Sequence, residues 1–534
     1  MLLVIVFALC SLLPTLLYAQ VDTAWVRTYN GPGNNTDNAS AIAVDRTGNV
    51  YVTGPSYGSG TDYDYTTIKY NSLGDSVWVR RYNGPGNGDD HVYAMALDNA
   101  GNVYVTGASY GSGTNHDYAT IKYNSAGDTV WVRRYHGPTN GESFAYAIAV
   151  DTAGNTYVTG MDVGTGSGAD YVTIKYNANG DTVWLRRYNG PANNTDGASA
   201  IAVDRTGNVY VTGSSRSATA FDDYATIKYN SNGVQQWVAR YNGAGNDADE
   251  AKAIAVDRQG NVYVTGYSYS SGANNDYLTI KYNSSGDTTW VRQFNGSGNS
   301  ADYAYAIAVD ESSNVCVTGG SYGSGTSLDI TTVKYNSTGV QEWLTRYNGS
   351  GNGSDVAYAM VLDNANNIYV TGTTYSTGTT ADFATIKYNS GGIPQWVQRY
   401  NGTGNGSDNA SAIAIDDANN IYVTGSSSGA SANSDYTTIK YVQGQGVAET
   451  IENCKLKIDN FSVYPNPTKT FFTIRLPKTT DHSEIKIFDV TGNIVKSEEL
   501  KGKNNRVSLD GIKNGIYFVK VGNEMMKEKL VVTR

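Results

Sequence analysis

A constant interval of 53 residues separates the eight tryptophans of this chain. They are Trp25, Trp78, Trp131, Trp184, Trp237, Trp290, Trp343 and Trp396. The same interval relates the lysines from Lys69 to Lys440, and residues 45–54 and 204–213 both read DRTGNVYVTG. A chain of 534 residues is too long for one compact core unless that core is built by repetition. Eight units of equal length are therefore the feature that most limits the fold.

One unit contains four strand-like runs, ASAIAVD, NVYVTG, DYTTIKYN and SVWVRRYN in the first copy. Their alternation of β-branched, aromatic and small residues is typical of short strands, as is a composition with 60 glycines and 43 tyrosines. Asp-x-x-Gly-Asn at 45–49 predicts a type I turn followed by a left-handed residue. Asn366 and Asn419 suit that conformation, and Ser313 is the unusual substitute.

Eight four-stranded antiparallel sheets predict an all-β protein, an eight-bladed β-propeller over residues 21–442. The chain begins with a lone fourth strand, TAWVRTY, and its last unit stops after the third strand at 436–441. We therefore expect the first strand to complete the last sheet and close the ring. An open solenoid is the alternative, but the polar capping units that it would need are not visible.

The motifs D[RNT]xGNVYVTG, DYxTIKYN and WVRRYNGxGN resemble the SBBP β-propeller repeat family over roughly 420 residues. The resemblance implies a propeller, to which the family's name gives seven blades, whereas this sequence offers eight. The family carries no assigned catalytic residues, so the resemblance implies no reaction.

The two ends of the chain predict export. Residues 1–20 are an apolar run that favours a secretory signal peptide over a membrane helix, because Pro14 interrupts it and a polar stretch follows. We expect no transmembrane span in the mature chain. Residues 443–459 have the composition of a linker, and 460–534 form a small basic domain whose strands predict an Ig-like β-sandwich.

This last domain resembles the type A C-terminal sorting domain of type IX secretion substrates. The residues that carry the resemblance are Tyr464, Pro465, Asn466, Pro467, Asp489, Gly492, Gly515 and Tyr517. The resemblance implies the type IX secretion machinery as a partner, and a protein that is secreted or held on the outer surface of a Gram-negative bacterium.

The long connections of every unit are expected on one face of the ring, because both short hairpins lie at the other end of the strands. This face is the predicted binding surface. Its candidate ligand contacts are loop tyrosines that can stack on sugars or anchor a protein. They are Tyr57, Tyr110, Tyr269, Tyr322 and Tyr375.

Two series of aspartates are expected at the same face. One opens the third strand, from Asp64 to Asp435, and the other lies in the links between units, from Asp37 to Asp408, with Ser143 as its exception. Calcium sites are one interpretation, with candidate ligands Asp37, Asp64, Asp90, Asp117, Asp196 and Asp223. The favoured alternative is structural: the carboxylates cap loop amides or pair with the repeated lysine, since no unit has the dense acidic spacing of a calcium loop.

A catalytic site would need a break in the repeat, and the three histidines of the propeller provide one. His91, His116 and His136 fall on the loop side of one predicted blade, where a Zn²⁺ or general-base site is conceivable. No histidine or cysteine pair has ligand spacing, and no nucleophile motif or phosphate loop accompanies them. We therefore expect a protein that is not an enzyme.

The expected function is that of a monomeric scaffold that binds an extracellular protein or carbohydrate through its long-loop face. A formal net charge of -10 argues against a nucleic-acid partner. The alternatives are a metal-dependent hydrolase or lyase with its site on the loop face, and a calcium-stabilised structural protein of the cell surface.

Overall fold

The computed structural model is built of strands joined by turns and loops, with no helix among the residues it describes. The chain divides into two compact units, residues 1–446 and 447–534. In the first unit the structure describes residues 21–217, 221–270, 274–429 and 433–443. In the second it describes residues 462–464, 468–475, 483–488, 494–500, 504–521, 524–525 and 530–533.

Each blade of the first unit begins with two antiparallel strands. The first strands are β2 (Ala41–Val44), β6 (Asp90–Leu97), β10 (Ser143–Val150), β14 (Asp196–Val203), β18 (Asp249–Val256), β22 (Asp302–Val309), β26 (Val356–Leu362) and β30 (Asn409–Ile415). The second strands are β3 (Val50–Tyr57), β7 (Val103–Tyr110), β11 (Thr156–Val163), β15 (Val209–Arg216), β19 (Val262–Tyr269), β23 (Val315–Tyr322), β27 (Ile368–Tyr375) and β31 (Ile421–Ser428).

Two further strands complete each blade. The third strands are β4 (Tyr63–Tyr70), β8 (His116–Tyr123), β12 (Ala169–Tyr176), β16 (Asp222–Tyr229), β20 (Asn275–Tyr282), β24 (Leu328–Tyr335), β28 (Ala381–Tyr388) and β32 (Ser434–Gln443). The fourth strands are β5 (Ser76–Tyr82), β9 (Thr129–Tyr135), β13 (Thr182–Tyr188), β17 (Gln235–Tyr241), β21 (Thr288–Phe294), β25 (Gln341–Tyr347), β29 (Pro394–Tyr400) and, for the last blade, β1 (Val21–Tyr29).

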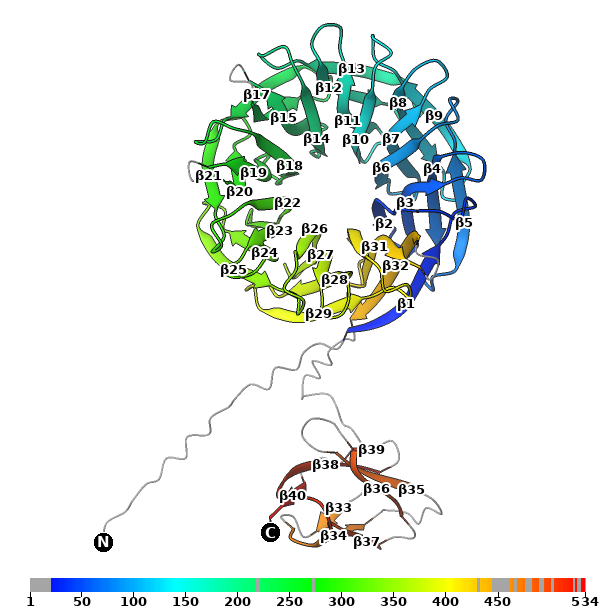
Figure 1. Cartoon of the computed structure of the whole chain (residues 1–534), viewed down its shortest axis with the longest axis vertical. Coiled ribbons are helices and arrows are strands. Elements are labelled where there is room, and N and C mark those ends of the chain that lie inside the picture. The colour runs from blue at the N-terminus through cyan, green and yellow to red at the C-terminus, as the bar shows by residue number, and fades with distance from the viewer. Residues whose placement is uncertain are drawn as a thin grey trace, which may run out of the picture. The chain divides into compact units, whose positions relative to one another are not determined.

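The eight sheets are arranged around an axis as an eight-bladed propeller, with the first strands innermost and the fourth strands outermost (Figure 1). We number the blades 1 to 8 from β2–β5 to β30–β32. Blade 8 takes its fourth strand from the start of the chain, because β1 pairs with β32 from Val21–Gln443 to Tyr29–Tyr436. Trp25 pairs with Lys440 as Trp78 pairs with Lys69, so this seam repeats the register of the other blades. The predicted fold class and its mode of ring closure are confirmed.

The repeated tryptophan and lysine join neighbouring blades. Trp78 packs between Tyr51 and Tyr123, at ring centroid distances of 6.0 and 6.1 Å, and its Nε1 donates a hydrogen bond to Ser125 O. Lys69 Nζ donates to the same carbonyl at 2.9 Å and lies over the Tyr51 ring. These residues therefore hold the sheets together and are not free for a ligand.

The tight turns have the predicted left-handed residue. Gly48 has a φ of 79°, and Asn366 and Asn419 replace the glycine at 59° and 61°. Ser313 adopts a φ of 64°, and its hydroxyl donates a hydrogen bond to Asp257 of the preceding blade at 2.9 Å. That contact offsets part of the cost of a left-handed serine.

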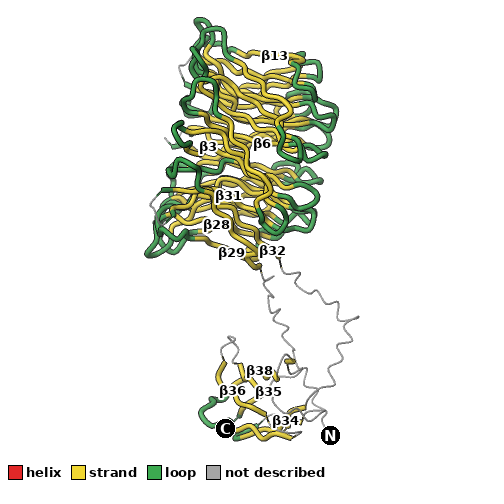
Figure 2. The backbone as a smooth tube through the Cα atoms, turned by 90° about the vertical axis from the view of Figure 1, so that its right-hand side faces the viewer, coloured by secondary structure: helices red, strands yellow, loops and turns green. Residues whose placement is uncertain are grey.

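The propeller has two different faces, with the strands between them (Figure 2). The turns from first to second strand and from third to fourth strand form the short-turn face. The loops from second to third strand and the links from one blade to the next form the long-connection face. This division follows from the strand order within each sheet and agrees with the sequence prediction.

The second unit contains two small sheets. Its strands are β33 (Ser462–Tyr464), β34 (Phe471–Arg475), β35 (Ser483–Phe488), β36 (Ile494–Leu500), β37 (Asn504–Ser508), β38 (Gly515–Val521), β39 (Glu524–Met525) and β40 (Leu530–Val532). One sheet has the order β33-β34-β37, and the other has the order β36-β35-β38-β39 with β40 also pairing with β38. Phe472, Ile485 and Val519 belong to one buried cluster, so the unit has its own core. No helix among the described residues of the chain is long and apolar enough to cross a membrane.

Candidate functional site

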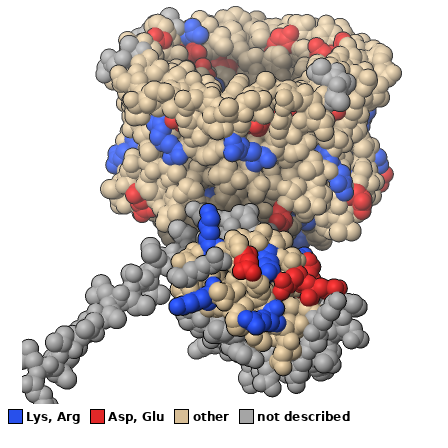
Figure 3. All heavy atoms as spheres, turned by 60° about the horizontal axis from the view of Figure 1, so that its bottom comes forward, with Lys and Arg blue, Asp and Glu red and all other residues tan. Residues whose placement is uncertain are grey.

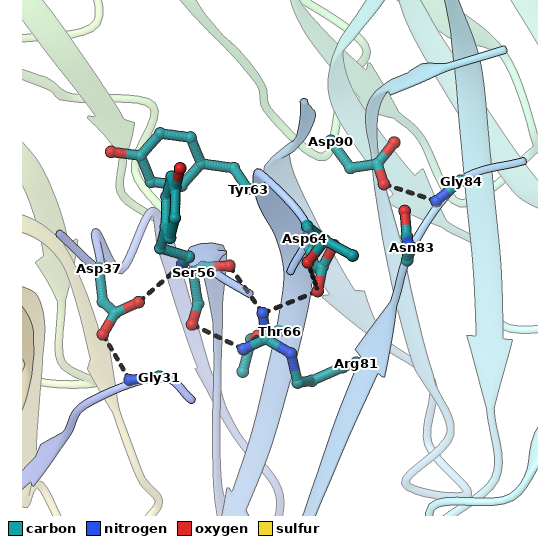
Figure 4. A network of polar contacts seen from close by, with 12 residues as sticks. Gly31, Asp37, Ser56, Tyr63, Asp64, Thr66, Arg81, Asn83, Gly84 and Asp90 are labelled. Carbon is teal, nitrogen blue, oxygen red and sulfur yellow. Dashed lines mark hydrogen bonds and ion pairs between the residues drawn. The ribbon is translucent and has the colours of Figure 1, made fainter. Parts of the chain in front are cut away.

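The link aspartates bind backbone amides at the long-connection face. Asp37 is fully buried, and its carboxylate accepts hydrogen bonds from Gly31 N at 2.6 Å and Tyr57 N at 2.9 Å (Figure 4). The contact with the link glycine recurs in the six other units of this series, at Asp90, Asp196, Asp249, Asp302, Asp355 and Asp408. Each carboxylate therefore fixes the link between two blades, and in most units it also fixes the end of the second strand.

The aspartates of the third strands pair with arginines of the fourth strands. Arg81 donates to Asp64 Oδ2 at 2.8 Å and to the backbone oxygen and hydroxyl of Ser56 (Figure 4). The same ion pair occurs in four other blades, as Arg134–Asp117, Arg187–Asp170, Arg240–Asp223 and Arg346–Asp329. The prediction that these carboxylates pair with the repeated lysine is wrong, because that lysine lies at the other end of the third strand.

The arginines also tie each blade to the preceding one. Arg134 donates to Tyr82 OH at 2.9 Å, and Arg240 donates to Tyr188 OH at 3.0 Å. Since these bonds reach the last residue of the preceding blade, they fix the point where each link begins. Both ends of the long connections are thus held by buried polar groups.

The six aspartates predicted as calcium ligands make other contacts in the structure. Asp37, Asp90 and Asp196 accept hydrogen bonds from link glycines. Asp64, Asp117 and Asp223 form the arginine ion pairs just described. Within the part of the chain that the structure describes, no three His, Cys, Asp or Glu side chains cluster in a way that could hold a metal ion. Calcium binding remains a prediction.

Blade 3 departs from the repeat by exchanging two paired residues. Ser143 stands where the other units have the link aspartate, and it pairs across the sheet with Asp162. In blade 2 the corresponding pair is Asp90 with Ser109. Asp162 accepts a hydrogen bond from Tyr135 OH at 2.5 Å and forms an ion pair with Arg187. The carboxylate has moved to the neighbouring strand, so its position at the face is preserved.

Blade 5 has no arginine at the position that pairs with the third-strand aspartate. Gln293 takes that position and donates to Asp276 Oδ2 at 3.1 Å. Burial of the carboxyl group, without a compensating cation, raises the pKa of Asp276 to about 6. The folded state therefore binds the Asp276 proton more tightly than the unfolded state does, and the associated stability is lost as the pH rises through about 6.

We expect Gln293→Arg to stabilise the propeller at pH 8, because the new cation favours the ionised form of Asp276. A carboxyl pKa of about 6, against an ordinary value of 3.8, corresponds to at most about 3 kcal/mol. Denaturant midpoints at pH 4 and pH 8 measure the change. The control is Arg346→Gln, which gives blade 6 the arrangement of blade 5 and should add a loss of stability above pH 6. If the pH dependence of stability is unchanged in both variants, the missing arginine is not the cause of the raised pKa of Asp276.

The loop tyrosines lie on the glycines of the links. A Cβ atom at Gly86 would stand 2.6 Å from Tyr110 Cδ1, and one at Gly353 would stand 2.5 Å from Tyr375 Cγ. Tyr110 and Tyr375 are each 37 % exposed, whereas Tyr57, Tyr269 and Tyr322 are half-buried. The repeated link glycines thus make room for rings that stay partly open to solvent.

The three histidines do not converge on one point. His116 Nδ1 lies 2.8 Å from Glu142 Oε2, and His136 Nδ1 lies 2.9 Å from Gly137 O. His91 packs against Tyr63 at a ring centroid distance of 5.3 Å, and burial lowers the pKa of its imidazole. Each histidine therefore has its own structural surroundings.

The structure also shows tyrosines that the sequence analysis did not single out. Tyr93, Tyr146, Tyr305 and Tyr358 are partly or largely exposed residues of the innermost strands. Each stands at a bulge, where the cross-strand pairing skips one residue. The repeated glycine of Tyr-Val-Thr-Gly is the signal that could have found this bulge, because a Cβ at Gly107 would lie 2.0 Å from His91 O.

Clefts also open between neighbouring blades on the short-turn face. One of about 440 Å³ lies between blades 4 and 5, and its lining includes Asp204, Lys228 and Arg258. Asp204 accepts hydrogen bonds from Asn208 and Tyr210, Lys228 donates to Ser284 O, and Arg258 forms an ion pair with Glu311. These three charged side chains are therefore already partnered within the protein.

Comparison with known families agrees with this architecture. The family described as Beta-propeller repeat (SBBP) matches residues 24–60, 77–113, 183–218, 236–272 and 395–431. The family described as Secretion system C-terminal sorting domain matches residues 462–533. The chain contains five matched β-propeller repeats and a secretion sorting domain. The sorting domain indicates type IX export, so this propeller is secreted or displayed at the cell surface, and the secretion machinery is one of its partners.

The residues of the predicted sorting motif are described only in part. Tyr464 ends β33 and Gly515 begins β38, while Tyr517 is buried and its hydroxyl donates to Lys513 O at 2.9 Å. Pro465, Asn466, Pro467, Asp489 and Gly492 lie outside the described residues, as does the predicted signal peptide. Of the predicted linker, Gln443 belongs to β32 and residues 444–459 lie outside the described residues.

Individual relatives are distant from this propeller or match little of it. β-Agarase A of Zobellia galactanivorans is 32 % identical over 65 residues, which is 12 % of each chain. PorZ, a surface component of the type IX secretion system of Porphyromonas gingivalis, is 18 % identical, with a TM-score of 0.39 over 92 % of this chain and 70 % of its own. Drosophila plexin A, solved in complex with semaphorin 1b, is 10 % identical, with a TM-score of 0.38 over 79 % of this chain and 87 % of its own. Both TM-scores are too low to indicate a shared function.

Proposed function

We propose that this secreted propeller is a non-enzymatic scaffold that binds an extracellular partner, protein or carbohydrate, through its long-connection face. The observation that carries the proposal is the network of link aspartates and fourth-strand arginines beneath that face. These buried groups hold the backbone on which the loop tyrosines rest. A surface ordered before binding loses less conformational entropy when a partner docks.

The loop sequences support binding rather than catalysis. The strands repeat closely, whereas the long loops differ, as in PSYGSGTDYD at 55–64 and MDVGTGSGAD at 161–170. Variable loops on a rigid scaffold are a common arrangement for recognition. Most aspartates and arginines beneath the face are engaged in structural contacts, and the proposal assigns no catalytic role to them.

A binding screen tests the proposal with the full-length secreted protein, labelled and applied to arrays of extracellular glycans and proteins. The test variant changes all five predicted loop tyrosines to Ala. Because exposed aromatic rings dominate many interfaces, we expect at least about a tenfold loss of affinity for any array ligand.

The matched control removes exposed apolar side chains from the short-turn face, Leu73, Val234 and Val340. Each is changed to Ala, and array binding should be unaffected. The proposal fails if the control variant loses binding while the tyrosine variant retains it, or if the intact protein binds nothing on either array.

A further inference from the structure

The inner rim of the long-connection face carries two facing pairs of tyrosines. Tyr93 and Tyr146 have ring centroids 5.4 Å apart at an interplanar angle of 48°, and Tyr305 and Tyr358 are 5.5 Å apart at 49°. Each residue of one pair is four repeats from its counterpart in the other. In a ring of eight blades, units four apart lie opposite each other, as β6 and β10 lie across the centre from β22 and β26 (Figure 1).

Each pair is the inner end of a longer aromatic tract. From Tyr93, ring contacts at 5.3 to 6.3 Å lead through His91 and Tyr63 to the loop residue Tyr57. From Tyr146 they lead through Phe144 and His116 to Tyr110, at 5.4 to 6.0 Å. The second pair continues through Tyr303 to Tyr267. Because every ring rests on another, the rim tyrosines are held in fixed orientations.

The four rim tyrosines have surface and hydroxyl groups available for a ligand. Tyr358 is 41 % exposed, and the other three are partly exposed. Within the described residues, no hydrogen bond occupies any of these four hydroxyls. Burial raises the pKa of Tyr93 and of Tyr305 to about 12, so both hydroxyls keep their protons and can donate.

The rim carries few charged groups, and the carboxylate near its first tyrosine pair, Glu142, contacts His116 Nδ1 at 2.8 Å. The equivalent positions in the other blades are Ser40, Ser199, Ser411 and Lys252. Lys252 forms an ion pair with Glu250 and lies over the Tyr267 ring, so its charge is compensated. On the side of the propeller that Figure 3 shows, basic side chains are scattered over the outer wall instead of forming one patch. This distribution does not fit a polyanion such as a nucleic acid, which calls for concentrated positive charge.

We propose that this rim binds a neutral polysaccharide chain, with sugar rings stacked on the two tyrosine pairs. The inference rests on the proposed function in taking the long-connection face as the binding face, and it adds a ligand class and new residues. A sugar ring offers an apolar C–H face to the tyrosine ring and hydroxyl groups to the tyrosine and serine hydroxyls. The two tyrosine pairs supply ring faces, and the tyrosines together with Ser40, Ser199 and Ser411 supply hydroxyl groups, so the rim offers both kinds of contact.

The experiment titrates the full-length protein with cellohexaose, laminarihexaose, mannohexaose and chitohexaose by isothermal titration calorimetry. The test variant is Tyr93→Ala with Tyr305→Ala, one ring from each pair. Its control is Leu73→Ala with Val340→Ala on the short-turn face, and a separate loop variant, Tyr110→Ala with Tyr322→Ala, tests the loop tyrosines. We expect at least one hexasaccharide to bind, the rim variant to weaken binding at least about tenfold, and the control to change it less than about threefold.

Two further measurements test the stacking surface of the tyrosine rings and the charge of the ligand separately. Tyr93→Phe with Tyr305→Phe keeps the stacking surface and should retain more affinity than the alanine variant. Binding should be unchanged in 0.5 M NaCl, because a neutral ligand releases no counterions. Melting temperatures of all variants show whether a loss of binding comes from unfolding.

Any of the following outcomes would overturn the inference. If only the loop variant loses hexasaccharide binding, the proposed function stands and the rim is not the site. If no hexasaccharide binds but a proline-rich decapeptide does, and the rim variant loses it, the rim takes a peptide. Binding that weakens with salt identifies a charged ligand, and absence of all hexasaccharide binding at 5 mM rejects the ligand class while leaving protein binding to the array test.

Discussion

A chain that begins at residue 30 is expected to lose the cooperative unfolding and the monomeric state of a chain that begins at residue 21. The nine residues of β1 supply the fourth strand of blade 8, and Trp25 packs between Tyr70 and Tyr422. Removing one buried tryptophan alone costs about 3 to 5 kcal/mol. The deletion also exposes the edge of β32, and an unpaired edge strand promotes association with other chains. Circular dichroism melting and size-exclusion chromatography measure both effects.

Single substitutions separate ring closure from local packing. Trp25→Ala and Trp184→Ala remove the same side chain from equivalent positions, since Trp184 lies between Tyr157 and Tyr229 in the interior of the sequence. We expect the two variants to lose similar stability and to remain monomeric. If Trp184→Ala proves as damaging as the deletion of β1, the seam has no special role in closing the ring.

The repeat made the fold predictable because it is set by short-range features. Strand alternation and turn residues act within a few positions, so each of eight copies provided the same information about the same element. Closure followed from the phase of the repeat alone, with a lone fourth strand at one end and a missing one at the other. Even Ser313, the least suitable turn residue, adopts the conformation that its seven counterparts require.

Partners of the buried charges could not be obtained from the repeat in the same way. Asp64 and Lys69 belong to one strand, where five residues span about 17 Å, so their pairing could have been rejected from spacing alone. The true partner, Arg81, depends on the register between β4 and β5, in which Thr66 faces Arg81. A period of 53 residues gives no information about that register, because it is identical in every unit.

The inner rim was missed for a related reason. A bulge changes which residue of the first strand reaches the rim, and a regular alternation pattern does not contain it. Tyr93 falls between Val92 and Ala94, at the point where the pairing with β7 skips one residue. Comparing the eight copies position by position would have singled it out, because tyrosine alternates there with serine and lysine while the neighbouring positions hold small apolar residues.

The turn glycines next to the tryptophans should be far less replaceable than other left-handed glycines. Gly127 has a φ of 88°, and a Cβ atom there would lie 2.8 Å from Trp78 Cδ2 of the preceding blade. Gly113 has nearly the same φ, 84°, but a Cβ atom there would have no neighbour within 4 Å. We expect Gly113→Ala to cost about 1 kcal/mol for the backbone alone. Gly127→Ala should cost about 3 kcal/mol or more, since the indole is held between two tyrosines and cannot move aside.

Urea denaturation followed by tryptophan fluorescence and circular dichroism measures both costs. A double-mutant cycle then shows whether the indole causes the additional cost of Gly127→Ala over Gly113→Ala, because Trp78→Ala removes the atoms that the new methyl group would meet. In the Trp78→Ala background, Gly127→Ala should cost no more than Gly113→Ala does in the intact protein. If the excess persists without the indole, contact with the tryptophan is not its cause. If the two glycine variants are equally stable from the start, backbone conformation alone explains why glycine recurs at these turns.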